Sequence, residues 1–407
     1  MRATRERATP KSTQGVAKIV ARCDRGGNKI RIAGGETLNG MGHAPERVDV
    51  TLSTVGLTGI AANERTDLVI SVRAGTPIAN LTSLLASQGQ FVPFDAPQPQ
   101  YATLGGTLAA GWLGPRRHLY GRPRDFLIGT TIVLADGTIA RAGGMVVKNV
   151  AGYDMSRLYV GSFGTLGVLT QANLKTIPRP THARLFLAPL PERTRERACT
   201  QLSALRVPPS AAFVIEGFHH AIDGDEGPEG RLLLLLEGSA ALIERATLEL
   251  RSALGRAGVP ETRIVDAGAR EAFERVVDAY VASLGERSVT YRLYPLAREA
   301  PSSASQMHGL AQSFELRGET IADLMNGDVV LRVSDLDSHA FGSKIENFDE
   351  ALHAMMPAAQ VVASNHPHRA NLRVWGTPPA AIDRMRALKA RFDPNRTLNP
   401  GCFVGGM

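Results

Sequence analysis

The stretch KNVAGYDMSRLYVGSFGTLGV occupies residues 148–168 and ends where a strand-like apolar run begins at Val168. It contains four glycines. Glycine tolerates left-handed backbone and lets a ligand approach the main chain closely. A single motif of this kind is a weak signal, because glycine-rich turns are often purely structural. It gains weight from two further segments of small residues that precede it in the chain.

The two earlier segments have the same character. IAGGET, residues 32–37, follows a run that alternates charged and apolar residues as a strand does. Successive glycines there can turn backbone amides toward an anion such as a pyrophosphate. YATLGGTLAAG, residues 101–111, suits close backbone approach to a flat ligand, although tight helix packing would use the same residues. Neither segment reads GxGxxG or GxxxxGK[ST], which argues against a Rossmann site or a nucleotide triphosphatase loop.

The N-terminal part of the chain predicts a mixed α+β unit that ends near Pro178 and Pro180. Residues 91–125 read as a long loop. Asp136-Gly137 indicates a hairpin. Thr76 and Pro77 indicate the start of a helix, with Thr76 as its cap. The expected helices are 13–24 and 76–87, and the expected strands are 29–33, 48–52, 68–72, 127–134 and 168–177.

Beyond this boundary the pattern predicts the β-α-β-β-α-β order of a ferredoxin-like layer. Residues 266–345 show no clear period, a Ser- and Ala-rich loop is expected at 300–306, and no internal repeat is visible. The expected strands are 183–190, 211–216, 231–236, 262–265, 289–294 and 329–333, and the expected helices are 192–205, 239–257, 345–356 and 379–392.

Composition limits the classes of function. The formal charge is +7, but the basic residues are scattered, which favours a solvated surface or a face for an acidic partner over nucleic-acid binding. Cys23, Cys199 and Cys402 lie far apart with no CxxC, so we expect no metal site and no disulfide framework. The basic N-terminus lacks the apolar core of a secretory signal, and the Leu232–Leu236 run is too short to span a bilayer. We expect a soluble, cytoplasmic protein.

Taken together, the order of the segments resembles the PCMH-type FAD-binding domain of the vanillyl-alcohol oxidase family. YGRPRD, residues 120–125, stands before an apolar strand that ends in Asp-Gly, as in that family. Residues 148–168 and GWLGPRR, residues 111–117, resemble one branch, the FAD-binding E subunit of bacterial glycolate oxidase. RFDPNRTLNPG, residues 391–401, resembles the closing segment of FAD-linked oxidases.

The resemblance implies a domain plan and a cofactor. A PCMH-type FAD-binding domain of two α+β subdomains would occupy residues 1–180, a ferredoxin-like α+β cap residues 181–384, and a returning C-terminal segment residues 385–407. Glu36 stands where members with covalent flavin carry a histidine, and His43 lies farther along the chain, so noncovalent FAD is expected. The main alternative is a linkage through His118, which lies near the second segment. The tail would fold back through Asn399, Pro400 and Gly401. The implied FAD contacts are Gly34, Gly35, Glu36, Thr37, Thr103, Leu104, Gly105, Gly106, Gly161, Ser162, Gly164, Thr165 and Gly167.

The implied reaction is hydride transfer from a small 2-hydroxy acid to FAD. It needs a cation for the carboxylate and a base for the hydroxyl proton. We expect Arg117 and Arg373 to be the cation and His366 to be the base. Each could instead be an ion pair or part of a polar loop, and Arg116, His368 and Tyr153 are further candidates.

The resemblance also implies partners. The catalytic D subunit of this family carries an HxGxGNxH segment, which this sequence lacks. We therefore expect dependence on a catalytic flavoprotein subunit and on an iron–sulfur subunit that accepts the electrons, with membrane contact only through them. The alternatives are a non-catalytic FAD electron relay and a stand-alone FAD oxidase of another hydroxy acid or a sugar alcohol.

Overall fold

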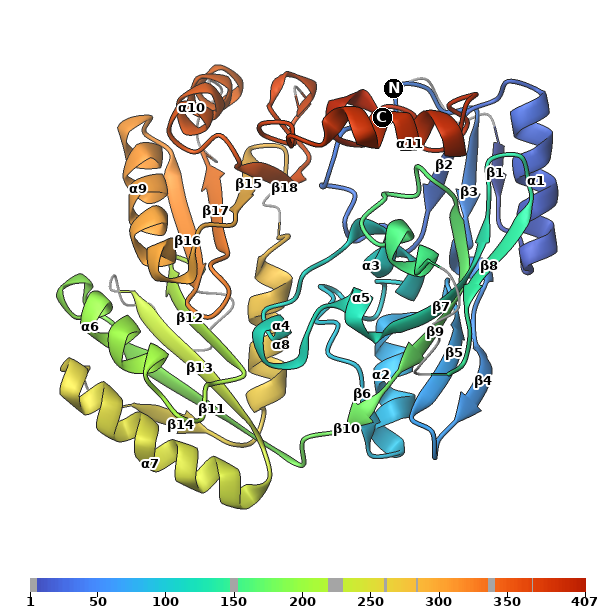
Figure 1. Cartoon of the computed structure of the whole chain (residues 1–407). Helices are drawn as coiled ribbons and strands as arrows, with labels where there is room; N and C mark the ends of the chain where they lie inside the picture. Colours follow the sequence, from blue (N-terminus) through green and yellow to red (C-terminus); the bar gives the residue numbers. More distant parts are fainter. Residues whose placement is uncertain are drawn as a thin grey trace. The chain divides into compact units, whose positions relative to one another are not determined.

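The computed structural model describes residues 6–146, 153–218, 230–259, 262–282, 285–335, 341–367 and 369–407. The chain forms two compact units (Figure 1). The first unit comprises Met1–Gly114, Gly121–Arg179 and Pro378–Met407, and the second comprises Pro115–Tyr120 and Pro180–Thr377. The short segment Pro115–Tyr120 therefore belongs to the second unit, although both of its flanks belong to the first.

The first layer of the first unit is a parallel sheet in the order β1-β3-β2. Its strands are β1 (Glu6–Ala8), β2 (Ile30–Ala33) and β3 (Val50–Ser53). Helix α1 (Thr13–Arg25) begins after Ser12, whose hydroxyl accepts a hydrogen bond from the Gly15 amide. The helix buries one apolar stripe, Val16, Val20 and Cys23, in the same hydrophobic cluster as this sheet.

The second sheet of this unit is antiparallel, in the order β4-β5-β9-β7-β8. In β9 (Val168–Lys175), buried and half-buried residues alternate along the whole strand, as expected for a sheet with one face on a core. The Asp136-Gly137 hairpin joins β7 to β8 as predicted, with Gly137 at φ 88°. The other strands of this sheet are β4 (Ile60–Glu64), β5 (Val69–Arg73), β7 (Leu127–Val133) and β8 (Ile139–Gly143). A separate short antiparallel pair is formed by β6 (Gln90–Phe91) and β10 (Ile177–Pro178).

Two predictions in this part are wrong. Helix α2 (Ile78–Ser87) begins later than expected, with Pro77 at the cap position, because the Thr76 hydroxyl bonds to the backbone of Gly59 instead. The expected loop at 91–125 contains three short helices that the glycines and prolines concealed. These helices are α3 (Leu104–Ala110), α4 (Arg117–Tyr120) and α5 (Pro123–Phe126). The first unit also contains α11 (Ile382–Phe392), near the C-terminus.

The second unit is built on one antiparallel sheet in the order β14-β11-β13-β12-β16-β17-β15-β18. Its first half has the predicted ferredoxin-like order. The elements of that half are β11 (His182–Pro189), α6 (Glu192–Ser203), β12 (Ala211–Glu216), β13 (Arg231–Gly238), α7 (Ala240–Ala257) and β14 (Arg263–Val265).

The second half repeats this order, which overturns the expectation of no internal repeat. The two halves join edge to edge through the antiparallel pair β12 and β16. Residues 300–306, expected to be a loop, begin a helix. The elements of this half are β15 (Ser288–Leu293), α9 (Ala300–Ser313), β16 (Arg317–Asp323), β17 (Val329–Ser334), α10 (Phe341–Met355) and β18 (Gln360–Ser364).

The helices of the second unit lie on both faces of its sheet. Helices α6, α7, α9 and α10 share one hydrophobic cluster with the sheet (Figure 1). Helix α8 (Ala269–Ala279) packs on the opposite face, where Phe273 and Tyr280 contact Phe213 of β12. Within the described ranges, no helix is both long and apolar enough to cross a membrane.

Candidate functional site

The first two glycine segments lie against each other in the first unit. A Cβ placed on Gly34 would lie 2.5 Å from Oγ1 of Thr103, and one on Gly35 would overlap the carbonyl oxygen of Tyr101. The Thr103 hydroxyl also accepts a hydrogen bond from the Gly106 amide at 3.2 Å and so caps α3. The two glycines are therefore required for the contact between the turn after β2 and the start of α3.

The third segment contacts α3 from its other end. The Gly161 amide donates to the Leu108 carbonyl at 3.0 Å, and the Phe163 amide donates to the Ala109 carbonyl at 2.8 Å. A Cβ on Gly111 would lie 2.7 Å from Cα of Gly161. Helix α3 is thus in contact with both other segments, and the three share one neighbourhood.

The backbone donors of the three segments differ in their availability. The amides of Leu104 and Gly105 donate to the carbonyls of Thr76 and Ala74, so protein acceptors already use them. In the described part of the chain, no backbone hydrogen bond is donated by residues 34–37. A bent segment with unused amides suits an anion such as a diphosphate, which is how the residues present fit FAD.

Glu36, which the resemblance places where a flavin-linking histidine would stand, has a left-handed φ of 59°. Its carboxylate lies 2.5 Å from the guanidinium of Arg31. His118 belongs to the second unit, where its Nε2 lies 2.8 Å from the Pro209 carbonyl oxygen, and burial lowers its pKa. The amide of His43 donates to the Cys402 carbonyl, so the residue lies beside the C-terminal segment.

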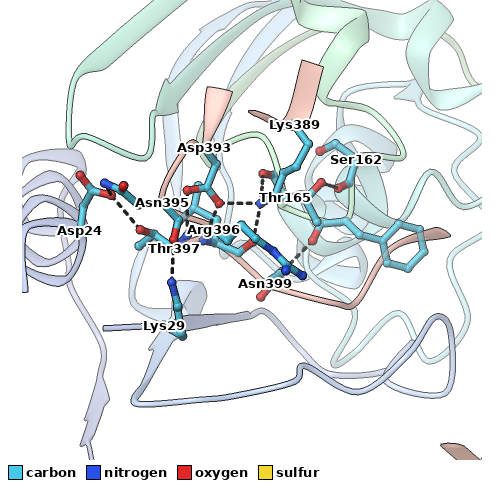
Figure 2. A network of polar contacts seen from close by, with 12 residues as sticks. Asp24, Lys29, Ser162, Thr165, Lys389, Asp393, Asn395, Arg396, Thr397 and Asn399 are labelled. Carbon is cyan, nitrogen blue, oxygen red and sulfur yellow. Dashed lines mark hydrogen bonds and ion pairs between the residues drawn. The ribbon is translucent and has the colours of Figure 1, made fainter. Parts of the chain in front are cut away.

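The C-terminal segment returns to the first unit, as predicted, and Figure 2 shows its contacts with the third glycine segment. The Asn399 side chain accepts a hydrogen bond from the Ile32 amide at 2.7 Å and donates one to the Phe163 carbonyl at 2.6 Å. It therefore links Ile32, the first residue of the first segment, to the middle of the third segment. A parallel bridge between Ile30 and Leu398 extends the β1-β3-β2 sheet.

A buried lysine holds the same segment in place. The Lys389 ammonium donates to the carbonyls of Thr165 (2.8 Å) and Leu398 (2.9 Å) and to the Asp393 carboxylate (2.5 Å). These contacts use all three of its N–H donors. Burial lowers the pKa of Lys389, and the charge of Asp393 opposes that shift. Asp393 also accepts hydrogen bonds from the amides of Thr397 and Leu398.

The arginine candidates for catalysis all lie in the second unit. Arg117 makes a bidentate ion pair with the buried carboxylate of Asp328, at 2.7 and 2.8 Å, which Arg292 also contacts. Although burial opposes it, these cations hold the pKa of Asp328 below its ordinary value. Arg116 pairs with Glu237 at 3.0 Å. Arg373 has an exposed side chain.

The histidine and tyrosine candidates are separated. His366 is buried after β18, and its ring meets that of Phe341 edge to face at 5.3 Å. Tyr153, in the first unit, is 93% exposed. His368 lies outside the described residues. Among the described residues, no group of three or more His, Cys, Asp or Glu is placed to hold a metal ion.

The sequence alone did not identify Lys389 or Asp328 as important. Lys389 stands four residues before Asp393, a spacing that can form an ion pair on one helix face. Its acceptor Thr165, however, is 224 positions away in the chain. Asp328 gives no local signal, since it is one acidic residue in a stretch that shows no period.

Comparison with known proteins places the first two glycine segments in a recognised domain. Residues 6–154 match the family model described as "FAD binding domain". A solved structure of alkyldihydroxyacetonephosphate synthase aligns with a TM-score of 0.69, covering 97% of this chain and 75% of that one at 16% identity. That likeness concerns the fold alone, and the predicted mixed α+β fold with an FAD-binding domain is confirmed.

Three curated relatives show which proteins this chain is similar to in sequence. Glycolate oxidase subunit GlcE of Escherichia coli (strain K12) is 41% identical over 174 residues, which is 42% of this chain and 49% of that protein. Glycolate oxidase subunit GlcD of Bacillus subtilis (strain 168) is 26% identical over 96% of this chain and 87% of that subunit. D-lactate dehydrogenase of Anaerostipes hadrus is 32% identical over 44% of this chain and 37% of that enzyme. The alignment with GlcE thus spans about half of that relative.

Proposed function

We propose that this chain, which carries an FAD-binding domain and is homologous to glycolate oxidase subunits and other FAD-linked hydroxy acid dehydrogenases, is the FAD-binding E-type subunit of a glycolate oxidase complex. One observation carries the proposal. The three glycine segments, of which the third resembles this branch, lie together in one unit, and the first of them offers unused backbone amides.

FAD would be held without a covalent bond. The amides of residues 34–37 and the third segment, 161–167, would hold the diphosphate, and Thr103 to Gly106 would lie along the flavin and ribityl chain. Glu36 cannot form the histidine linkage, and its carboxylate is paired with Arg31. Acid precipitation of the purified protein should therefore release all of the flavin into the supernatant.

When bound, FAD would supply the hydride acceptor for the C2 hydrogen of the hydroxy acid. The chain must hold the carboxylate and take the hydroxyl proton. Arg373 is our candidate to bind the substrate carboxylate because its side chain is exposed. The guanidinium of Arg117 is instead ion-paired with the carboxylate of Asp328. His366 is the candidate base. In this arrangement Arg117 holds the Pro115–Tyr120 segment within the second unit.

A second candidate function is an FAD electron relay with no substrate site of its own. The ion pair between Arg117 and Asp328 favours this relay, because it leaves Arg117 unsuited to bind a substrate carboxylate. The lack of an HxGxGNxH segment in the sequence also favours it. In both versions the electrons would pass to an iron–sulfur partner, because the three cysteines of this chain are widely separated. We place the complex in the cytoplasm, in contact with a membrane only through its partners.

Anaerobic mixing of the purified protein with glycolate distinguishes these functions. Rapid bleaching of the flavin by glycolate alone supports a catalytic site in this chain. Bleaching only after the partner subunits are added supports the relay. Turnover of a different alcohol with oxygen supports a stand-alone oxidase. A purified protein without flavin would contradict all three.

Two substitutions then test the site residues. Arg373→Ala should raise the glycolate concentration for half-maximal reduction, and His366→Ala should slow reduction by roughly 10²-fold or more. Arg298→Ala is the matched control, because Arg298 is also an arginine of the second unit and is 81% exposed. If the flavin of both variants is reduced as fast as the flavin of this control, Arg373 and His366 are not site residues.

A further inference from the structure

The third glycine segment turns two of its carbonyls toward the C-terminal segment (Figure 2). The Phe163 carbonyl accepts a hydrogen bond from Nδ2 of Asn399 at 2.6 Å. The Thr165 carbonyl accepts one from Nζ of Lys389 at 2.8 Å. Both donors belong to residues that are less than 10% exposed.

The direction of these carbonyls fixes the direction of the next two amides. In a planar trans peptide, the C=O of one residue and the N–H of the following residue point in opposite directions. The amides of Gly164 and Leu166 must therefore point away from Asn399 and Lys389. Within the described residues, neither amide donates a backbone hydrogen bond. A backbone donor without an acceptor is costly unless a ligand or water accepts from it.

The two donors are themselves held firmly. Asn399 has a left-handed φ of 43°, and its side-chain oxygen accepts from the amide of Ile32, the first residue of the first glycine segment. Lys389 also binds the Asp393 carboxylate, which is fully buried. The C-terminal segment thus joins the third glycine segment to β2, the strand that leads into the unused amides of residues 34–37.

We propose that Asn399 and Lys389 are positioning residues for the diphosphate of FAD. By binding the carbonyls of Phe163 and Thr165, they keep the amides of Gly164 and Leu166 directed to the diphosphate. Asn399 also sets the separation between the first and third segments. This inference rests on FAD as the cofactor and not on the identity of the substrate.

Asn399→Asp is the most selective test. The aspartate has the same shape and can still accept from the Ile32 amide, but it places a second carboxylate oxygen against the Phe163 carbonyl. We expect the dissociation constant of FAD, measured by quenching of flavin fluorescence in the apo-protein, to rise roughly tenfold. The ³¹P resonances of the bound diphosphate should also shift, which a general loss of stability would not cause.

Asn395→Ala is the matched control, because this exposed side chain in the same segment bonds to Asp24 on α1. Its FAD affinity and ³¹P spectrum should match those of the wild-type protein. If Asn399→Asp does not fold, Asn399→Gly removes both hydrogen bonds while suiting the positive φ, and the same measurements apply.

The proposal is overturned if the folded Asn399 variant keeps wild-type FAD affinity and an unchanged ³¹P spectrum. The outcome is independent of the proposed reaction. A wild-type flavin that glycolate does not reduce would remove the oxidase assignment, yet the effect of Asn399 on FAD binding could still be measured.

Discussion

At the scale of single residues, the glycine contacts give a direct test of the cofactor site. Gly35→Ala should cost about 1–3 kcal/mol of unfolding free energy and lower the bound FAD, because the new Cβ would overlap the Tyr101 carbonyl. Gly309→Ala is the control, since Gly309 lies inside α9 with open space around it. That change should stabilise the protein by about 0.5–1 kcal/mol. Equal flavin content and melting temperature in both variants would contradict the packing argument.

A second prediction at this scale concerns Asp323. Burial, together with the charge of Asp328, raises the pKa of Asp323 from 3.8 to about 7. The folded protein then keeps a proton that the unfolded chain has released, so this group's stability contribution is lost as pH rises from about 4 to about 7. In an Asp323→Asn variant, the amide oxygen could still accept from the amides of Met325 and Asn326, which bond to Oδ1 of Asp323.

Urea denaturation of wild type and Asp323→Asn at pH 4 and pH 8 measures this effect. The stability of the variant relative to wild type should increase with pH by on the order of 1–4 kcal/mol. Carboxyl groups that do not interact with Asp323 titrate alike in both proteins and cancel in the comparison. Parallel pH profiles would show that Asp323 titrates normally.

At the scale of elements, the sequence predicts those whose causes are local. The alternation along β9 and the apolar stripe of α1 arise from residues close together in the chain. Helix α3 was missed because two glycines lie inside it, and its stability comes from the Thr103 cap and from contacts with distant segments. The glycine segments could also be recognised from the local sequence. The hydrogen-bond partners of Lys389 and Asn399 could not, because they are distant in the chain.

Helix α9 and the internal repeat were missed for related reasons. The run APSSASQ is typical of a loop, yet Pro301 suits the first turn of a helix, and Ala304, Met307 and Ala311 are buried on one face. The two halves of the second unit share an order of elements and not a sequence pattern. Such a repeat becomes visible only from strand pairing.

At the scale of the whole molecule, the FAD-binding unit is assembled from three separate pieces of chain, and the last piece is residues 378–407. Ending the chain after Thr377 removes the Leu398 bridge to β2 and the contacts of Lys389 and Asn399. We expect the truncated protein to lose FAD binding, and the melting transition of the first unit to fall or disappear.

The second unit should be insensitive to this truncation, because all eight strands of its sheet precede Thr377. Calorimetry should therefore show the transition of the second unit preserved and that of the first unit lowered or lost. Adding residues 378–407 as a separate peptide should restore part of the FAD binding, since the lost contacts are non-covalent. If the truncated protein holds FAD as tightly as the full chain, the C-terminal segment does not support the site, and the positioning role of Asn399 fails with it.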